Sequence, residues 1–263
     1  MGGPAGPNRA AVCGISAALL AYGFLGWPVA VLAQRSLLVH MGQQCALLLA
    51  IAPLLVIALG SWSSRWMSIG TRSGRILRAL TTPITATLIF NTVVIGSFVP
   101  AVMNAAVRHP AAGAALDLAL LAAGIVMWTP VLGTTPVSHG LRRTVRAGYL
   151  IIQSIVPSFA SLVFIFDRAP IYDVFRTAPR TIGITPLVDQ QLAGALAKIV
   201  GLAVMLGAAG AILLRSDTEP EPEPSGPTDA PVDGGPDSLP DVLTWDHVEQ
   251  ELRRVGFRES GDG

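Results

Sequence analysis

The stretch SLLVHMGQQCALLLAIAPLLVIALGSW, residues 36–62, decides the fold class. Between Leu37 and Leu59 it holds no formally charged residue. As a helix rising about 1.5 Å per residue, that length crosses a hydrocarbon layer of roughly 30 Å. The stretch therefore predicts a membrane-spanning helix. Its first turns nevertheless carry a set of polar and sulfur side chains: His40, Met41, Gln43, Gln44 and Cys45.

The composition of the whole chain agrees with this prediction. Of the 263 residues, 51% are hydrophobic and 13% are charged, and the mean hydropathy is +0.56. Such values predict an all-α, polytopic membrane helix bundle and not a soluble domain. The sequence has no Walker loop, dinucleotide fingerprint, HExxH motif or serine nucleophile elbow, so we do not expect an enzyme. We also expect no nucleic-acid partner.

Six apolar runs predict six transmembrane helices within residues 10–215, after an N-terminal segment of residues 1–9. The runs cover residues 10–27, 37–59, 83–106, 114–132, 147–166 and 187–214. The first run can also be read as a signal peptide. Gly26, Trp27 and Pro28 provide no small-x-small cleavage site, which favours a helix that stays in the membrane. The arginines between the second and third runs are expected in a loop.

The arginines at the ends of these runs predict the orientation. One side holds nine of them: Arg9, Arg65, Arg72, Arg75, Arg78, Arg142, Arg143, Arg146 and Arg215. The other side holds five: Arg35, Arg108, Arg168, Arg176 and Arg180. Because cytoplasmic flanks are enriched in Lys and Arg, we expect both termini in the cytoplasm.

This orientation places polar and sulfur groups of four helices at one depth, near the outer face. They are His40, Met41, Gln44, Cys45, Met103, Asn104, Asp117, Asp189 and Gln190. If the helices adjoin, these groups form a pocket open to the extracytoplasmic side. Imidazole, thiolate and thioether are the ligands that copper(I) selects, so His40, Met41, Cys45 and Met103 are candidate copper ligands. Simpler roles stay open: Met as packing, Cys45 as an inert small residue, and the aspartates as helix caps.

Lys198 lies near the middle of the last run, where an ionisable group is expensive and usually has a partner or a function. It can reach toward the interface, contact a backbone carbonyl or bind another protein. A transport role is a further alternative. A transporter is expected to show an internal repeat or matching broken helices, and the sequence shows neither.

Four motifs, in order, resemble one known family. They are SLLVHMGQQCALLLAIAPLL at 36–55, FVP at 98–100, AGIVMWTPVLG at 123–133 and TPLVDQQLAGALAK at 185–198. Together they resemble the caa3-type CtaG family of integral-membrane cytochrome c oxidase assembly factors, over nearly all of residues 25–214. The resemblance implies a multi-pass protein of the bacterial cytoplasmic membrane that helps copper reach a haem-copper oxidase. Its implied partners are oxidase subunits or other assembly factors.

The chain departs from the family pattern at its histidines. The family's HMxxH segment is kept at His40 and Met41, but Gln44 replaces the second histidine. Three further differences are a missing histidine before Pro100, Leu116 and Asp117 in place of a Glu-His pair, and Trp128 alone in place of a tryptophan pair. A site of several imidazoles therefore cannot be transferred to this chain.

The sequence leaves two explanations open. In the first, a rebuilt Met/Cys/His site binds copper(I) transiently, and His40→Ala lowers the copper bound by the protein. In the second, the protein is a metal-free membrane scaffold or interaction protein in respiratory-complex biogenesis.

The C-terminal part of the sequence has a different character. Residues 216–240 are rich in Glu-Pro pairs, Gly, Ser and Asp, which predicts a disordered, acidic linker. Residues 241–258 predict a short cytoplasmic amphipathic helix, because one apolar stripe recurs at helical spacing: Val242, Trp245, Val248, Leu252 and Val255. Such a short helix is marginal alone, so we expect it to dock on its own bundle or on a cytoplasmic partner.

Overall fold

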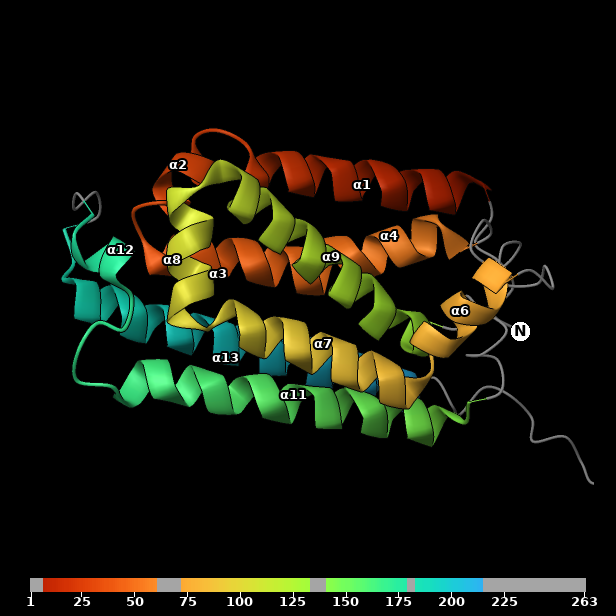
Figure 1. Ribbon diagram of the computed structural model, residues 1–263. Helices are drawn as coiled ribbons and strands as arrows, with labels where there is room; N and C mark the ends of the chain where they lie inside the picture. Colours follow the sequence, from red (N-terminus) through yellow and green to blue (C-terminus); the bar gives the residue numbers. More distant parts are fainter. Residues whose placement is uncertain (1–6, 61–71, 133–140, 179–182, 215–263) are drawn as a thin grey trace, which may run out of the picture. The chain divides into compact units, whose positions relative to one another are not determined.

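The computed structural model describes residues 7–60, 72–132, 141–178 and 183–214 (Figure 1). Within these ranges the chain forms helices and no strands, which confirms the all-α fold class. Five of the helices are long and apolar enough to cross a membrane, and a bent helix pair makes a sixth span if it is counted as one. The chain is thus a multi-pass membrane protein. The predicted linker and terminal helix, 216–258, lie outside the described residues.

The first span is α1 (Pro7–Leu25), which a short helix, α2 (Val29–Ala33), follows. α1 packs along the second span, whereas several of its apolar side chains, such as Leu19, remain exposed. Exposed apolar side chains are what a lipid-facing helix requires.

The second span consists of three consecutive segments: α3 (Leu37–Cys45), the π-helix η1 (Ala46–Ile51) and α4 (Ala52–Ala58). The widened π-helical turns directly precede Pro53, which stands in the first turn of α4. A proline has no N–H for the carbonyl four residues earlier, and its ring crowds that carbonyl. A local π-helix is one of the ways in which a helix accommodates such a break. This composite span lies against α1, α9 and α13, at the centre of the bundle.

The third apolar run is not one straight helix. It forms α7 (Pro83–Ser97) and α8 (Pro100–Arg108), whose axes differ by 69°. Val99 is extended, with φ −64° and ψ 128°, as expected for a residue that precedes a proline. The bend swings α8, with Met103 and Asn104, across the end of the bundle, where it meets α9 and α12.

The expected basic loop is partly helical, because Arg72–Leu80 forms helix α6. Three further long helices complete the bundle: α9 (Pro110–Leu132), α11 (Arg143–Phe166) and α13 (Pro186–Leu214). The short α12 (Asp173–Arg176) lies between the last two. In Figure 1, α12 and α6 mark opposite ends of this helical unit, which we call the α12 end and the α6 end.

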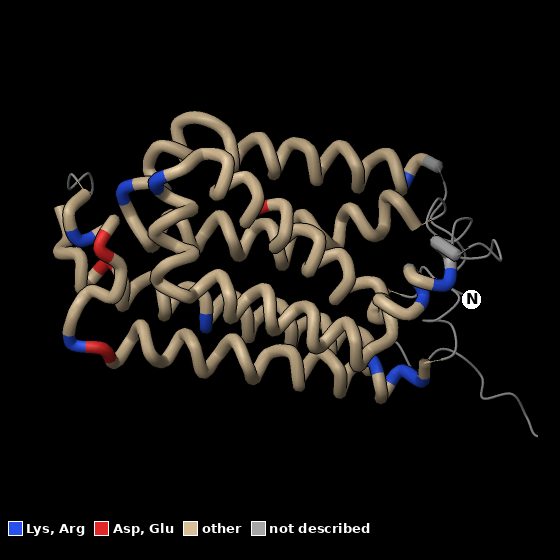
Figure 2. The backbone as a smooth tube through the Cα atoms, viewed as in Figure 1, with Lys and Arg blue, Asp and Glu red and all other residues tan. Residues whose placement is uncertain are grey.

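Charge and close packing distinguish the ends from the middle of the bundle. Lys and Arg gather at both ends, and the length between them carries few charges (Figure 2). α11 and α13 pack extensively against each other. At Gly194 a β-carbon would lie 2.8 Å from Phe164 Cβ and 2.8 Å from the Ser161 carbonyl oxygen, so only glycine allows this approach.

Candidate functional site

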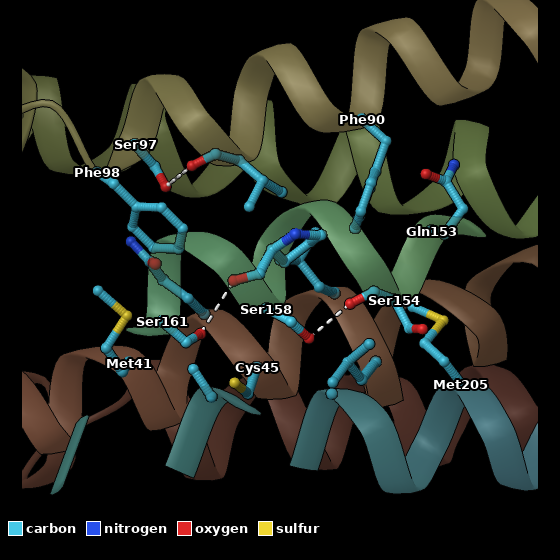
Figure 3. A pocket seen from close by; sticks show the side chains of 17 residues that line it. Met41, Cys45, Phe90, Ser97, Phe98, Gln153, Ser154, Ser158, Ser161 and Met205 are labelled. Atoms are coloured by element: carbon cyan, nitrogen blue, oxygen red, sulfur yellow. Dashed lines mark hydrogen bonds between the residues drawn. The ribbon is translucent and has the colours of Figure 1, made fainter. Parts of the chain in front are cut away.

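A cavity of about 60 Å³ lies inside the bundle, between α3, η1, α7, α11 and α13 (Figure 3). This volume is the space that the centre of a water molecule can occupy. On this measure, a cavity of roughly 10–15 Å³ holds one water molecule. The cavity therefore has room for a small ion together with water. Leu48, Phe90 and Val94 are among its apolar walls. Its polar and sulfur lining consists of Met41, Gln44, Cys45, Ser97, Gln153, Ser154, Ser158, Ser161 and Met205.

Three sulfur-bearing side chains line this cavity. Met41 and Cys45 come from successive turns of α3, and Met205 comes from α13. Figure 3 shows Met41 and Met205 toward opposite ends of the cavity, with Cys45 between them. The sulfur atoms are therefore spread along the cavity and do not converge on one point. Such a row suits successive brief contacts with an ion better than one closed coordination shell.

One face of α11 supplies a row of serines. Ser154, Ser158 and Ser161 recur at i, i+4 and i+7, and each hydroxyl donates to a carbonyl of its own helix. Ser158 Oγ, for example, donates to the Ser154 carbonyl at 2.6 Å. Since each donor is occupied, the oxygen lone pairs remain free to accept from a ligand or a water molecule.

A chain of hydrogen bonds leads from the cavity toward α7 and α9. Gln153 Nε2 donates to Tyr149 Oη at 3.0 Å, and Tyr149 Oη donates to the Met127 carbonyl at 3.1 Å. Asn91 Nδ2 donates to Gln153 Oε1 at 2.9 Å. Asn91 Oδ1 is buried and has no hydrogen-bond partner in the described part of the chain. A buried acceptor of this kind is where an ordered water is expected.

The π-helix beside the cavity is held by a tryptophan on α9. Trp128 is buried, and its indole Nε1 donates to the Leu48 carbonyl at 2.8 Å. Gly124, one turn earlier on α9, makes room for this contact, because a β-carbon there would lie 2.8 Å from Ala52 Cβ. α9 thus stabilises the irregular segment that continues directly from Cys45.

Trp128→Phe is expected to lower the free energy of unfolding by about 1.5 kcal/mol, since the buried Leu48 carbonyl loses its donor while the aromatic packing is largely kept. The measurement is unfolding of the purified protein in mixed detergent micelles. Trp27→Phe is the matched control, because Trp27 is 81% exposed. Equal losses in the two variants would contradict the role of the indole hydrogen bond.

His40 lies just outside the cavity. Its Nε2 is 3.3 Å from Gln44 Nε2, one turn further along α3, and its ring packs against Phe175 of α12 at a centroid distance of 6.1 Å. Gln44 itself lines the cavity. The imidazole is therefore placed between the α12 end and the sulfur row.

Met103 is fully buried in a cluster at the α12 end. The cluster contains Leu37, Met41, Met103, Phe164, Tyr172, Phe175 and Ala193. Met41 thus belongs both to this cluster and to the cavity lining. Tyr172 Oη donates to the Phe98 carbonyl at 2.8 Å, and burial raises the pKa of the Tyr172 hydroxyl, which keeps the donor protonated.

Asp189 joins the starts of two helices. Its carboxylate accepts from Ser36 Oγ at 2.7 Å, from the Leu37 N–H at 2.6 Å and from the Leu38 N–H at 3.3 Å. Asp189 stands in the first turn of α13, so it caps α3 from a different helix. The N-terminus of a helix favours an anion because its first N–H groups lack partners. The carboxylate therefore orients α3, which carries Met41 and Cys45.

Gln190 and Asn104 hold the connection between α11 and α13. Gln190 Oε1 accepts from the Ile171 N–H at 2.7 Å, and Asn104 Oδ1 accepts from the Val174 N–H at 3.4 Å. Both side chains are thus engaged with backbone groups. Of the five polar residues predicted for an outer pocket, Gln44 lines the cavity described here, whereas Asn104, Asp189 and Gln190 tie helices and loops together.

Asp117 and Lys198 lie apart from the sulfur row. Asp117 is partly buried on α9, which does not border the cavity. Lys198 lines a groove between α11 and α13 that shares Ser154 and Ser158 with the cavity, and Lys198 itself does not line the cavity. The structure therefore brings together Met41, Gln44 and Cys45, places Met103 and His40 next to them, and leaves Asp117 and Lys198 elsewhere.

The side-chain atoms that could bind a metal determine which metal ions suit the cavity. Within the described ranges, no group of three or more His, Cys, Asp or Glu residues lies close enough to hold a metal ion. The cavity lining supplies two thioethers and one thiol instead. Such soft donors suit copper(I) and are poor ligands for magnesium or calcium.

Sequence reasoning missed several residues of the site. Met205, the α11 serines and Gln153 line the cavity but were not among the predicted site residues. The serine spacing of three and four residues is a signal that could have marked this face of α11. Met205 gives no such signal, because only the packing of α13 against α3 and α11 turns it inward.

Comparison with known proteins identifies the family. No curated protein and no solved structure shows significant similarity to the chain. The family model described as cytochrome c oxidase caa3 assembly factor (Caa3_CtaG) matches residues 3–216, which includes all the described helices. The chain therefore belongs to the family of cytochrome c oxidase caa3 assembly factors.

Proposed function

We propose that this assembly factor passes copper(I) toward a haem-copper oxidase through the sulfur-lined cavity. The observation that carries the proposal is the row of Met41, Cys45 and Met205 in one buried cavity. Copper(I) tolerates irregular geometry with soft ligands, so each step along such a row can use a thioether, the thiol or water. Copper is cargo in this scheme and is not a resident cofactor.

Because the family's further histidines are missing from this chain, we expect its affinity for copper(I) to be low. A site with one imidazole nearby and spread sulfur donors binds copper(I) less tightly than a shell of several converging ligands. Weak, short-lived binding favours release to an acceptor. His40, at the edge of the cavity, is the proposed point of entry, and Met103 behind Met41 is the proposed supporting thioether.

The arrangement in the membrane follows from the distribution of arginine. With both termini in the cytoplasm, the α12 end faces the extracytoplasmic side of the bacterial membrane, and copper enters there. Oxidase subunits or other assembly factors are the partners that receive it. A metal-free scaffold in the same assembly process is the alternative, and the missing family histidines, such as the one that Gln44 replaces, are the observation that favours it.

Copper(I) binding by the purified protein tests the proposal. The variant Met41→Leu/Cys45→Ser/Met205→Leu is expected to bind copper(I) about tenfold or more weakly, in competition with a chromogenic copper(I) chelator. His40→Ala is expected to lower the copper bound at limiting concentration. The matched control is Met127→Leu/Cys13→Ser, since Met127 is buried in α9 and Cys13 lies on α1, both away from the cavity.

The functional test expresses each variant in a strain that lacks this chain. Oxidase activity per haem a is then measured in the membranes of that strain. The triple variant is expected to restore activity only with added copper, whereas the control variant restores it at limiting copper. Unchanged copper affinity together with full activity in the triple variant would support the metal-free scaffold instead.

A further inference from the structure

Lys198 places a positive charge near mid-membrane depth, far from both ends of α13. It lies twelve residues after Pro186 and sixteen before Leu214 in α13, which is about 18 Å and about 24 Å along the helix axis. A lysine side chain is much shorter than either distance, so its ammonium does not reach the level of either end. Ionisable groups at such depth almost always pair with another group or serve a function.

The surroundings of Lys198 form an open groove between α11 and α13. The groove has a volume of about 310 Å³, and Ser154 and Ser158 are its other polar lining residues. Ile155 and Phe159 line it as well, and they are 48% and 65% exposed. A cation and two hydroxyl oxygens are thus set among exposed apolar side chains on the outside of the bundle.

The described part of the chain offers Lys198 no acidic partner. Asp189 is nine residues away on the same helix and is held by the start of α3. Asp173 pairs with Arg176 at 2.8 Å, and Asp167 follows the end of α11. Asp117 belongs to α9, which does not line the groove. The charge in the groove is therefore not neutralised from within these residues.

We propose that this groove docks a transmembrane helix of a partner protein that carries an Asp or Glu at mid-membrane depth. The carboxylate meets the Lys198 ammonium and accepts a charge-assisted hydrogen bond, which is strong where water is scarce. Ser154 and Ser158 accept remaining hydrogens of the ammonium, and the apolar side chains of the incoming helix pack on Ile155 and Phe159. Polar contacts of this kind hold membrane helices together because lipid offers no alternative partner.

An acidic transmembrane helix fits better than a lipid. The anionic part of a lipid lies at the membrane surface, many ångströms from Lys198, whereas a helix that crosses the membrane can present a carboxylate at the required depth. This inference does not depend on copper binding. The copper(I) affinity of the Lys198 variants is expected to equal that of the unaltered protein, so the two proposals fail separately.

Photo-crosslinking of the full chain in its native membrane tests the docking proposal. A benzoylphenylalanine at position 159 is expected to form an adduct with an integral-membrane protein, and the same probe at position 19 on α1 serves as the control, since Leu19 is 67% exposed. Lys198→Met is expected to lower the yield of the adduct about tenfold, and Lys198→Arg is expected to keep it. Lys198→Gln gives a second test of the lost charge if the methionine variant does not accumulate.

The adduct then identifies the complementary charge. The crosslinked peptide is expected to lie in a transmembrane helix that contains an Asp or Glu. Lys198→Glu is expected to abolish the adduct, and replacing that acid by Lys in the partner is expected to restore it. Four results would overturn the proposal: an adduct unaffected by Lys198→Met, adducts with lipid alone, an adduct with a second copy of this chain, or a partner helix without an acid.

Discussion

Asp189→Ala is expected to lower the free energy of unfolding by about 3 kcal/mol, because one substitution removes the acceptor of three donors. The substitution leaves three donors without their acceptor: the Ser36 hydroxyl and the N–H groups of Leu37 and Leu38. Water does not readily replace the carboxylate, because Asp189 is only 6% exposed. The start of α3 also loses the anion that its dipole favours. Unfolding in mixed detergent micelles measures the effect.

The geometry of the cap also predicts a functional consequence. Asp189 ties α13 to the start of α3, so its loss is expected to loosen the placement of Met41 and Cys45 relative to Met205. Under the proposed copper role, copper(I) binding is expected to weaken together with stability. Asp189→Asn, which keeps the shape and one acceptor oxygen, is expected to lose roughly half as much stability.

Asp173→Ala provides the matched control for Asp189. Asp173 also lies near the α12 end, but its ion pair with Arg176 is exposed, with side chains 58% and 59% accessible. Exposed pairs of this kind contribute about 0–1 kcal/mol. If Asp173→Ala lowers the free energy of unfolding as much as Asp189→Ala does, the loss comes from removing a negative charge near the α12 end and not from removing the cap of α3.

Gly194→Ala is expected to lower the free energy of unfolding by about 2 kcal/mol, because the new methyl group has no room between α11 and α13. It would lie 2.8 Å from the backbone carbonyl oxygen of Ser161 and 2.8 Å from Phe164 Cβ. Neither atom is the flexible end of a side chain, so the two helices have to move apart. Because α11 and α13 both line the cavity, its shape changes with them.

Gly201→Ala is the control for this prediction. Gly201 lies seven residues further along the same helix and lines the cavity, but a β-carbon there meets nothing within 4 Å. Its substitution is expected to change the free energy of unfolding by no more than about 0.5 kcal/mol. Similar losses at both positions would indicate a general intolerance of α13 to alanine, and the close-approach argument would fail.

The bends and irregular turns of the helices could not be predicted from the sequence of each segment alone. The prolines of the third run were visible in the sequence, but their effect was not, because a proline in a membrane helix is compatible with either a straight span or a sharp bend. The structure bends at Pro100 by 69° and thereby brings Met103 and Asn104 over the α12 end. The π-helix before Pro53 was likewise not predicted, because a helix can accommodate a proline in several ways, and the hydrogen bond from Trp128 to the Leu48 carbonyl of this segment comes from another helix.

The candidate site was predictable only in part. His40, Met41, Gln44 and Cys45 lie on adjacent turns of one helix, so spacing alone placed them together. Asp189 was predicted as a residue of an outer pocket, but the partners that its carboxylate binds lie more than 150 residues away in sequence, so its role as a cap of α3 was not predictable. Met205 stayed unnoticed because nothing in α13 by itself distinguishes an inward methionine from a lipid-facing one.

The sequence by itself determined the class of the protein: a multi-pass helical membrane protein that belongs to a family of oxidase assembly factors. Those conclusions rest on the length, apolarity and order of segments, which are properties of each segment alone. Three features depend on tertiary structure alone: Asp189 caps α3, Gly194 allows the close approach of α11 and α13, and Met205 lines the same cavity as Met41 and Cys45. Helical periodicity defines the faces of each helix, but the packing of all the helices together determines which faces meet, because that depends on the shapes of every side chain between them.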